Sequence, residues 1–213
     1  MPTIDSYKIH SKNRKLYLRI VKGHFATSHS HINYYIDVTM PKNRLSEAKE
    51  IAKELVSYYS HSTVVDTVLC LDGTQVIGAC LANELMKENF MSMNSHQTVY
   101  VVTPEHTTGS QLVFRDNIVP MIEGKHVLIL AASVTTGYTA QAAAEAIQYY
   151  GGRVVGISAI FSTLDICIGH EVRSVFTTKD LDDYASYPSH DCPICKQGTP
   201  IQALVNSFGF SKL

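Results

Sequence analysis

The sequence predicts an α/β protein with a central, mostly parallel sheet that is flanked by helices, together with a small N-terminal segment. Short runs rich in Val, Ile and Leu alternate along the chain with longer segments of helical periodicity, as strands and helices do in parallel sheets. Two of these runs, residues 64–71 and 125–132, lead through a Gly-containing turn into a helix. We expect residues 1–44 to form the N-terminal segment and residues 45–213 to form the α/β core.

The N-terminal segment is expected to contain two strands joined by a loop. Residues 16–21 and 34–38 carry β-branched and aromatic residues in alternation, which is typical of half-buried strands. The loop between them, residues 23–33, is polar and contains three histidines. Clustered histidines suggest a metal site, but these lie in an expected loop with no carboxylate nearby, so no metal is assigned to them.

The first half of the core is expected to run helix, strand, turn and helix. Ser46 can cap a helix that ends near Tyr59, because apolar residues recur there on one face. The expected strand over residues 64–71 is rich in Val and Leu. The Gly-containing turn over residues 72–78 then leads into a helix over residues 79–88.

The remaining elements follow the same alternation. A strand is expected over residues 98–102, and the long stretch 103–123 after it has irregular character. Loops of that length inside a compact domain are usually functional or mobile. Residues 153–161 and 172–177 predict two further strands, and a short helix is expected to start at Leu181.

The segment over residues 125–150 organises the chain. An apolar strand ends in a hydroxyl-rich turn with one glycine, and an Ala-rich helix follows at residues 140–150. Unpaired N–H groups at a helix N-terminus, the helix dipole and Thr hydroxyls together suit a phosphate. A turn merely capped by threonines is the alternative. The expected phosphate-binding residues are Thr135, Thr136, Gly137, Tyr138 and Thr139.

The five cysteines give no clear metal or disulfide pattern. Cys192 and Cys195 form a single C-x-x-C, with no second such pair to complete the four ligands that zinc needs. A thioredoxin-like motif is expected after an early strand and not near a C-terminus. We therefore interpret this segment as a structural turn, with metal binding as the less favoured alternative, and assign no metal ligands.

Composition limits the class of partner. Hydrophobic residues make up 45% of the 213 residues, which is enough for a real core and argues against disorder. Lys and Arg number 18 against 19 Asp and Glu, so charge gives no case for a nucleic-acid or membrane partner. The polar start and the lack of a long apolar run predict a cytoplasmic protein.

The string from the apolar strand to Thr139 resembles the phosphoribosyl-pyrophosphate motif of the type I phosphoribosyltransferases. That motif has two acidic residues, two further residues and then Thr-Thr-Gly-x-Thr/Ser. Ala131 and Ala132 stand here at the two acidic positions. The resemblance implies the type I phosphoribosyltransferase fold with an N-terminal hood. It also implies a pyrophosphate-side turn, formed by Asp72, Gly73 and Thr74.

Two further strings resemble the orotate phosphoribosyltransferases within that family. One runs from Phe25 to a Tyr-Tyr-Ile-Asp sequence, which in the family belongs to the hood over the base. The other is the Cys-Pro-x-Cys…Gly-x-Pro tail, and the resemblance spans residues 25–201 in all. These enzymes join orotate to phosphoribosyl pyrophosphate with magnesium. The residues thereby implied on the base side are Phe25, Tyr35, Ser162 and Thr163.

Three groups that the family's reaction needs are missing by this alignment. The acidic pair, which supports the charge-deficient ribose, is replaced by alanines. The family's mobile loop carries lysines that stabilise the departing pyrophosphate, whereas His106 stands here and Arg115 comes later. Ser162 and Thr163 occupy the positions of an Asp-Arg pair whose Arg binds the orotate carboxylate.

Two main hypotheses follow, and enzyme activity stays open between them. In the first, the chain binds a phosphoribosyl ligand or nucleotide and transfers weakly or not at all to orotate, without a cofactor. In the second, it is an active phosphoribosyltransferase of nucleotide biosynthesis or salvage that uses magnesium, with Asp72, Glu105 and His106 as catalytic candidates. A structural subunit of a hetero-oligomer is a third idea.

The resemblance implies a homodimer, and the apolar segments near residues 34–35 and 91–93 are the suggested interface.

Overall fold

The computed structural model describes residues 6–12, 14–28, 30–87, 93–94, 98–107, 111–206 and 208–213. Contacts within the chain divide it into two compact units. The central unit is Pro41–Thr177, and the terminal unit combines Met1–Met40 with Thr178–Leu213. The C-terminal residues thus group with the N-terminal strands, while the expected domain boundary between residues 44 and 45 stays a prediction.

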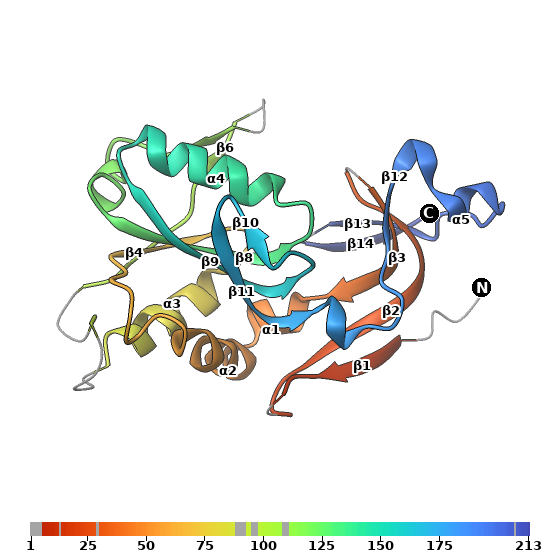
Figure 1. Cartoon of the computed structure of the whole chain (residues 1–213), viewed down its shortest axis with the longest axis horizontal. Helices are drawn as coiled ribbons and strands as arrows, with labels where there is room; N and C mark the ends of the chain where they lie inside the picture. Colours follow the sequence, from red (N-terminus) through yellow and green to blue (C-terminus); the bar gives the residue numbers. More distant parts are fainter. Residues whose placement is uncertain are drawn as a thin grey trace. The chain divides into compact units, whose positions relative to one another are not determined.

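The central unit is built on a mostly parallel sheet with the order β10-β11-β9-β8-β4-β5 (Figure 1). Its neighbours run parallel except for the short β10, which is antiparallel to β11. The fold class expected from the sequence is therefore confirmed. The strands are β4 (Thr67–Cys70), β5 (Tyr100–Val102), β8 (His126–Val134), β9 (Arg153–Ser162), β10 (Ile166–Cys167) and β11 (His170–Thr177).

Helices cover both faces of this sheet. Figure 1 shows α4 on one face, and α2 and α3 packed together on the other. Their apolar stripes are buried against the sheet, as the helical periodicity predicts. None of the described helices is long and apolar enough to cross a membrane. The helices are α1 (Thr39–Asn43), α2 (Leu45–Val56), α3 (Gln75–Leu85) and α4 (Tyr138–Tyr149).

The strand order changes direction between β4 and β8. From β4 the chain passes through α3 to β5 on one side, whereas from β8 it passes through α4 to β9 on the other. Ligands of open α/β sheets bind beyond the carboxyl ends of the strands at such a switch point. Cys70, the last residue of β4, pairs with Leu130, and β8 continues from there to Val134, so the turns that follow the two parallel strands both lie at the carboxyl edge of the sheet.

Close packing fixes α3 against β4. A Cβ atom on Gly78 would lie 2.3 Å from the Cys70 sulfur, so a side chain there would push the helix away from the strand. Residues 127–132 of β8 are all buried and form the centre of the core. The near-continuous apolar sequence of β8 follows from its burial on both faces.

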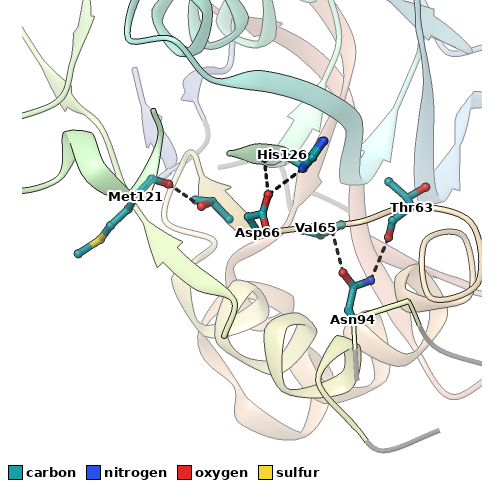
Figure 2. Close-up of polar contacts among 7 residues, drawn as sticks. Thr63, Val65, Asp66, Asn94, Met121 and His126 are labelled. Carbon is teal, nitrogen blue, oxygen red and sulfur yellow. Dashed lines mark hydrogen bonds and ion pairs between the residues drawn. The ribbon is translucent and has the colours of Figure 1, made fainter. Parts of the chain in front are cut away.

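Polar contacts secure the opposite, amino-terminal ends of β4 and β8 (Figure 2). One carboxylate oxygen of Asp66 accepts the backbone N–H of His126 at 2.7 Å and lies 2.8 Å from the Nδ1 atom of the same residue. Asn94 accepts the Val65 N–H at 2.8 Å and donates to the Thr63 carbonyl at 2.9 Å. Because both contacts flank the start of β4, they help to hold its register against β8.

The terminal unit is a second sheet, with the order β12-β3-β2-β13-β14 and with β1 paired to β2. Strand β13 runs parallel to β2, and the other pairs are antiparallel. Its strands are β1 (Ser6–His10), β2 (Tyr17–Ala26), β3 (Ser30–Asp37), β12 (Ser186–Pro188), β13 (Ala203–Asn206) and β14 (Gly209–Lys212). The remaining short elements are β6 (Glu105–His106), β7 (Leu112–Val113), η1 (Val119–Met121), η2 (Thr178–Asp180), η3 (Ser189–Asp191) and α5 (Pro193–Lys196).

Two local expectations were wrong in this unit. The expected loop over residues 23–33 is a β-hairpin, because β2 continues to Ala26 and β3 begins at Ser30. No helix starts at Leu181 either. The carbonyls of Asp182 and Asp183 instead accept hydrogen bonds from side chains of β3, which removes them from a helical ladder.

Replacing Asn94 by Ala is expected to lower the free energy of unfolding by about 1–3 kcal/mol, because a buried N–H and a carbonyl both lose their partner. Asn94 is fully buried, and so is the Val65 that donates to it. Denaturant unfolding followed by circular dichroism measures the change. Asn83→Ala, on the exposed face of α3, is the control and should shift stability by less than about 0.5 kcal/mol. Equal effects of the two variants would contradict the bracing role of Asn94.

Candidate phosphate-binding site

The turn after β8 presents the N-terminus of α4. Strand β8 ends at Val134, and the helix begins at Tyr138 after a bend. Gly137 occupies the N-cap position with φ +81°, and no side-chain hydrogen bond caps the helix there. The N–H groups of the first helical turn have no acceptor within the helix, and the dipole adds partial positive charge. Thr136 and Thr139 are exposed beside them, so the turn can receive an anion.

Glycine is required at position 137 for two reasons. Its φ angle lies in the left-handed region, which costs other residues free energy. A Cβ atom there would also lie 2.9 Å from the Cys167 sulfur and 3.4 Å from a Leu164 methyl group. Burial raises the pKa of Cys167, so this thiol is a packing group beside the turn and not a charged one.

Neighbouring backbone and hydroxyl groups hold the turn in place. Thr163 donates its N–H to the Val134 carbonyl at 2.9 Å and its hydroxyl to the Thr135 carbonyl at 2.8 Å. The hydroxyl of Ser162, which is 2% exposed, lies within donating distance of the Leu164 carbonyl at 2.8 Å and the Val134 carbonyl at 3.2 Å. Both side chains were implied on the base side by the resemblance. The structure gives them a bracing role, and their contact with a base stays a prediction.

The second expected turn follows β4 and is pinned to β8. Thr74 is fully buried, and its hydroxyl lies within donating distance of the Leu71 carbonyl at 2.8 Å and the Leu130 carbonyl at 3.0 Å. Asp72 and Gly73 both have positive φ angles, of 54° and 79°. This geometry turns the backbone sharply at the strand end and explains why α3 starts at Gln75 and not at residue 79.

Lys42 is a component of this site that the sequence did not reveal. Its ammonium group donates to the Asp72 carbonyl at 2.7 Å, and the residue is only 4% exposed. It therefore places a buried positive charge against the backbone of the Asp72–Thr74 turn. A lysine in a short polar run beside Asn43 and Arg44 resembles an ordinary surface residue, so no sequence signal distinguishes it.

The two alanines at the acidic positions are part of the core. Ala131 is 1% exposed and Ala132 is fully buried. Ala131 pairs with Ala159 of β9 and packs within the main apolar cluster. Magnesium is bound through carboxylates and substrate phosphates, and methyl groups offer it no ligand. These positions therefore do not fit a protein-bound magnesium ion.

The catalytic candidates come from separate elements. Glu105 and His106 form β6, which pairs with β7, whereas Asp72 follows β4. Arg115 donates twice to one Glu105 oxygen, at 2.9 and 2.6 Å, and this hydrogen bonding holds the pKa of Glu105 below its ordinary value. Glu105 is thus an ionised, paired carboxylate and a poor general acid near neutral pH.

The stretch over residues 103–123 is more ordered than its sequence suggests. The β6–β7 hairpin lies within it, and Leu112 and Phe114 are buried in the core of the central unit. Residues 108–110, at the tip of the expected catalytic loop, lie outside the described residues. The described part of the stretch is therefore anchored by apolar contacts at its C-terminal side.

Phe25 and Tyr35 lie in the terminal unit, where both are buried against each other with ring centroids 6.1 Å apart. Their place on the base side stays a prediction. Tyr34 is buried as well, so Tyr34 and Tyr35 do not offer the exposed surface that the suggested dimer interface needs. Met93 is 49% exposed, while residues 91 and 92 lie outside the described part of the chain. The homodimer stays a prediction.

Comparisons with known proteins agree with this architecture. No family model matches the chain. The orotate phosphoribosyltransferase of Chlorobium phaeobacteroides is 23% identical over 188 residues, which are 86% of this chain and 88% of the relative. That of Sulfurimonas denitrificans is 25% identical over 206 residues, or 87% and 94% of the two chains.

Solved structures extend the likeness to the fold. The orotate phosphoribosyltransferase of Mycobacterium tuberculosis superposes with a TM-score of 0.53 at 19% identity, covering 77% of this chain and 92% of the other. The adenine phosphoribosyltransferase of Leishmania donovani gives 0.50 at 14% identity, covering 84% and 89%. The fold is therefore that of the type I phosphoribosyltransferases. Within that class the chain resembles the orotate phosphoribosyltransferases over most of its length.

Replacing Gly137 by Ala is expected to lower the free energy of unfolding by about 2–5 kcal/mol. About 1–2 kcal/mol comes from the left-handed backbone and about 1–3 kcal/mol from overpacking against Cys167. Denaturant unfolding measures the change. Cys167→Ala removes the sulfur atom that clashes, so it should recover part of the loss in the double variant.

Gly124→Ala is the matched control for this prediction. Gly124 also has a positive φ angle, of 67°, but no atom lies within 4 Å of a Cβ built there. Its substitution should cost only the backbone part, about 1–2 kcal/mol. Equal losses at the two glycines, with no coupling between positions 137 and 167, would show that the turn tolerates a side chain.

Proposed function

We propose that this chain binds a phosphoribosyl ligand, either phosphoribosyl pyrophosphate or a nucleotide, through the turn over residues 135–139, and that it transfers poorly or not at all to orotate. The observation that carries the proposal is the combination of a phosphate-type turn with buried alanines at the acidic positions. The turn keeps the groups that recognise phosphate. The strand before it lacks the groups that promote transfer.

Phosphate recognition rests on groups that need no carboxylate. The first turn of α4 supplies N–H donors and the helix dipole, and Gly137 lets the backbone approach an anion closely. Thr136 and Thr139 add hydroxyl donors on the exposed side. The neighbouring Asp72–Thr74 turn, with Lys42 against its backbone, adds positive charge on the side expected for pyrophosphate.

Transfer to orotate requires charges that this site lacks. The ribose becomes positive at C1 as pyrophosphate leaves, and Ala131 and Ala132 cannot stabilise that charge. Loss of one preorganised electrostatic partner typically costs about a hundred- to a thousandfold in rate. The position of the carboxylate-binding arginine is taken by Thr163, whose hydroxyl donates to the Thr135 carbonyl. These losses together support a binding function over an efficient orotate transferase.

An active phosphoribosyltransferase is the alternative function. It is supported by the orotate phosphoribosyltransferases among its relatives and by Lys42, a buried cation that could partly replace loop lysines near a leaving pyrophosphate. Magnesium would belong to this alternative, carried by the phosphates of the substrate. The adenine phosphoribosyltransferase with the same fold illustrates that the fold does not select the base.

Replacing Thr139 by Val is expected to weaken the binding of phosphoribosyl pyrophosphate about ten- to a hundredfold, because a hydrogen bond to a charged phosphate is lost at unchanged side-chain shape. Isothermal titration calorimetry measures the dissociation constant. Thr98→Val, at an exposed threonine before β5 and away from the strand carboxyl ends, is the control and should bind as the parent does. Parent protein that shows no heat of binding, or equal affinity of both variants, would overturn the placement of the ligand.

Orotate consumption by the parent protein, with phosphoribosyl pyrophosphate and magnesium, is expected to be at least about a thousandfold slower than in a typical enzyme of median rate. Restoring the acids as Ala131→Glu with Ala132→Asp should not rescue it, because both positions are buried and Thr163 still cannot pair with the orotate carboxylate. Absorbance of orotate follows the reaction. Turnover at ordinary enzyme rates in the parent protein would favour the active alternative.

A further inference from the structure

Four potential metal ligands meet inside the terminal unit. His24 lies on β2, His31 on β3, Cys192 directly before α5, and Cys195 within it. Their donor atoms all lie within 4.8 Å of one another. His24 is 1% exposed, Cys192 2% and His31 9%, while Cys195 reaches the surface. All four residues belong to the terminal unit, whereas the turns of the candidate phosphate site belong to the central unit.

The β2–β3 hairpin brings the two histidines together. Ala26 pairs with His31 across the hairpin, and His24 lies two residues before Ala26 on the same face. The register of the pair shifts between Lys22 and Phe25, and such irregularities re-aim nearby side chains. The result is that the His24 Nε2 and His31 Nδ1 atoms lie 3.2 Å apart.

The C-terminal segment delivers the two cysteines to the same place. Strand β12 pairs with β3 so that Tyr187 faces His31, which sets the chain beside the hairpin just before Cys192. Strand β13 pairs with β2 after the cysteines, and the Gln202 N–H donates to the His24 carbonyl at 2.8 Å. Between these strands, Cys192 at the N-cap of α5 and Cys195 within the helix place both sulfur atoms within 4.8 Å of the histidine nitrogens.

The distances match a tetrahedral ion. The Cys192 and Cys195 sulfur atoms each lie 3.6 Å from His24 Nε2, and the Cys195 sulfur lies 3.3 Å from His31 Nδ1. Tetrahedral zinc with its usual bond lengths sets nitrogen–nitrogen distances of about 3.3 Å and nitrogen–sulfur distances of about 3.5 Å. These four distances agree with the tetrahedral values, and the other two pairs of donor atoms lie within 4.8 Å, so one ion can reach all four atoms.

A further contact orients one ligand. The other ring nitrogen of His24, Nδ1, lies 2.9 Å from the Thr199 carbonyl. A carbonyl only accepts, so Nδ1 must carry the hydrogen, and the lone pair of Nε2 is then directed into the cluster. Metal-bound histidines almost always donate their second N–H to such a partner, which fixes ring and tautomer.

We propose that His24, His31, Cys192 and Cys195 bind one zinc ion that has a structural role. Two cysteines and two histidines around a tetrahedron form a donor set typical of structural zinc sites. Two thiolates neutralise the charge of the ion, so the buried site carries no net charge. On binding, each thiol releases its proton to solvent, and no redox step is involved.

The geometry favours zinc over a redox pair of cysteines. A C-x-x-C redox centre needs only the two sulfur atoms, and the two buried imidazoles that face them here would have no function in it. In a metal site all four groups are used. The site would also link the C-terminal segment to the hairpin, because His24 and Cys192 are 168 residues apart in the sequence. A metal that closes so long a loop stabilises the folded chain.

Elemental analysis by mass spectrometry tests the proposal on the full chain purified without chelators. We expect about one zinc per chain in the parent protein. The double variant Cys192→Ser with Cys195→Ser should retain almost none. Cys80→Ser, at a cysteine on α3 outside the cluster, is the matched control and should keep the parent's zinc content. His31→Cys preserves four ligands and should keep the metal, whereas His31→Ala should lose it.

Cobalt substitution keeps the test decisive if a variant does not fold. Parent protein loaded with Co²⁺ should show the intense visible bands of a tetrahedral ion with thiolate ligands, and zinc should abolish them. Absence of zinc both after purification and after titration would overturn the proposal. So would an octahedral cobalt spectrum, an intact Cys192–Cys195 disulfide in freshly purified protein, or full zinc content in the folded double variant.

Discussion

The parallel pairing of β4 with β8 is the contact on which the candidate phosphate site depends. From these two strands the chain continues in opposite directions along the sheet, and their register fixes how far each following turn projects from the shared carboxyl edge. The buried Thr74 hydroxyl ties one turn to the Leu130 carbonyl of the other strand. At the amino-terminal ends of the strands, the Asp66 carboxylate accepts a hydrogen bond from the backbone N–H of His126, the first residue of β8. Both contacts are short and buried or half-buried, which makes the strand ends a rigid support for a ligand site.

The alanines at positions 131 and 132 alter this site in two ways at once. They remove the negative charge that a ribose cation would need. No carboxylate at these positions then competes with a bound phosphate for the N–H groups of α4. They also join the apolar core, where Ala131 packs against the neighbouring strand. A carboxylate restored there would have to be accommodated in buried surroundings, which raises its pKa and costs stability. Binding without efficient transfer is therefore consistent with the packing as well as with the electrostatics.

Features that depend on residues close together in the sequence could be predicted, whereas features that depend on residues far apart in the sequence could not. The strand, turn and helix around Gly137 are specified by residues close together in the chain, so their pattern was sufficient. Lys42 could not be recognised, because only the fold places its ammonium group against the Asp72 carbonyl. The hairpin over residues 23–33 was taken for a loop because its polar histidines hide the alternation of buried and exposed positions. The imidazoles of His24 and His31 are buried, which hydropathy alone does not anticipate.

The same reasoning explains why a structural turn was favoured over a metal site for Cys192 and Cys195 from the sequence. A zinc site made of two close pairs is recognisable only when both pairs are seen, and here the histidine pair precedes the cysteine pair by more than the whole central unit. Each pair alone is an ordinary feature of a hairpin or a turn. Strands β12 and β13 bring the pairs together by pairing with β3 and β2 on either side of the cysteines. The tail thus gains a physical reason for its Cys-Pro-x-Cys sequence: proline starts the short helix at its first position, and the spacing of three residues directs both sulfur atoms at one point.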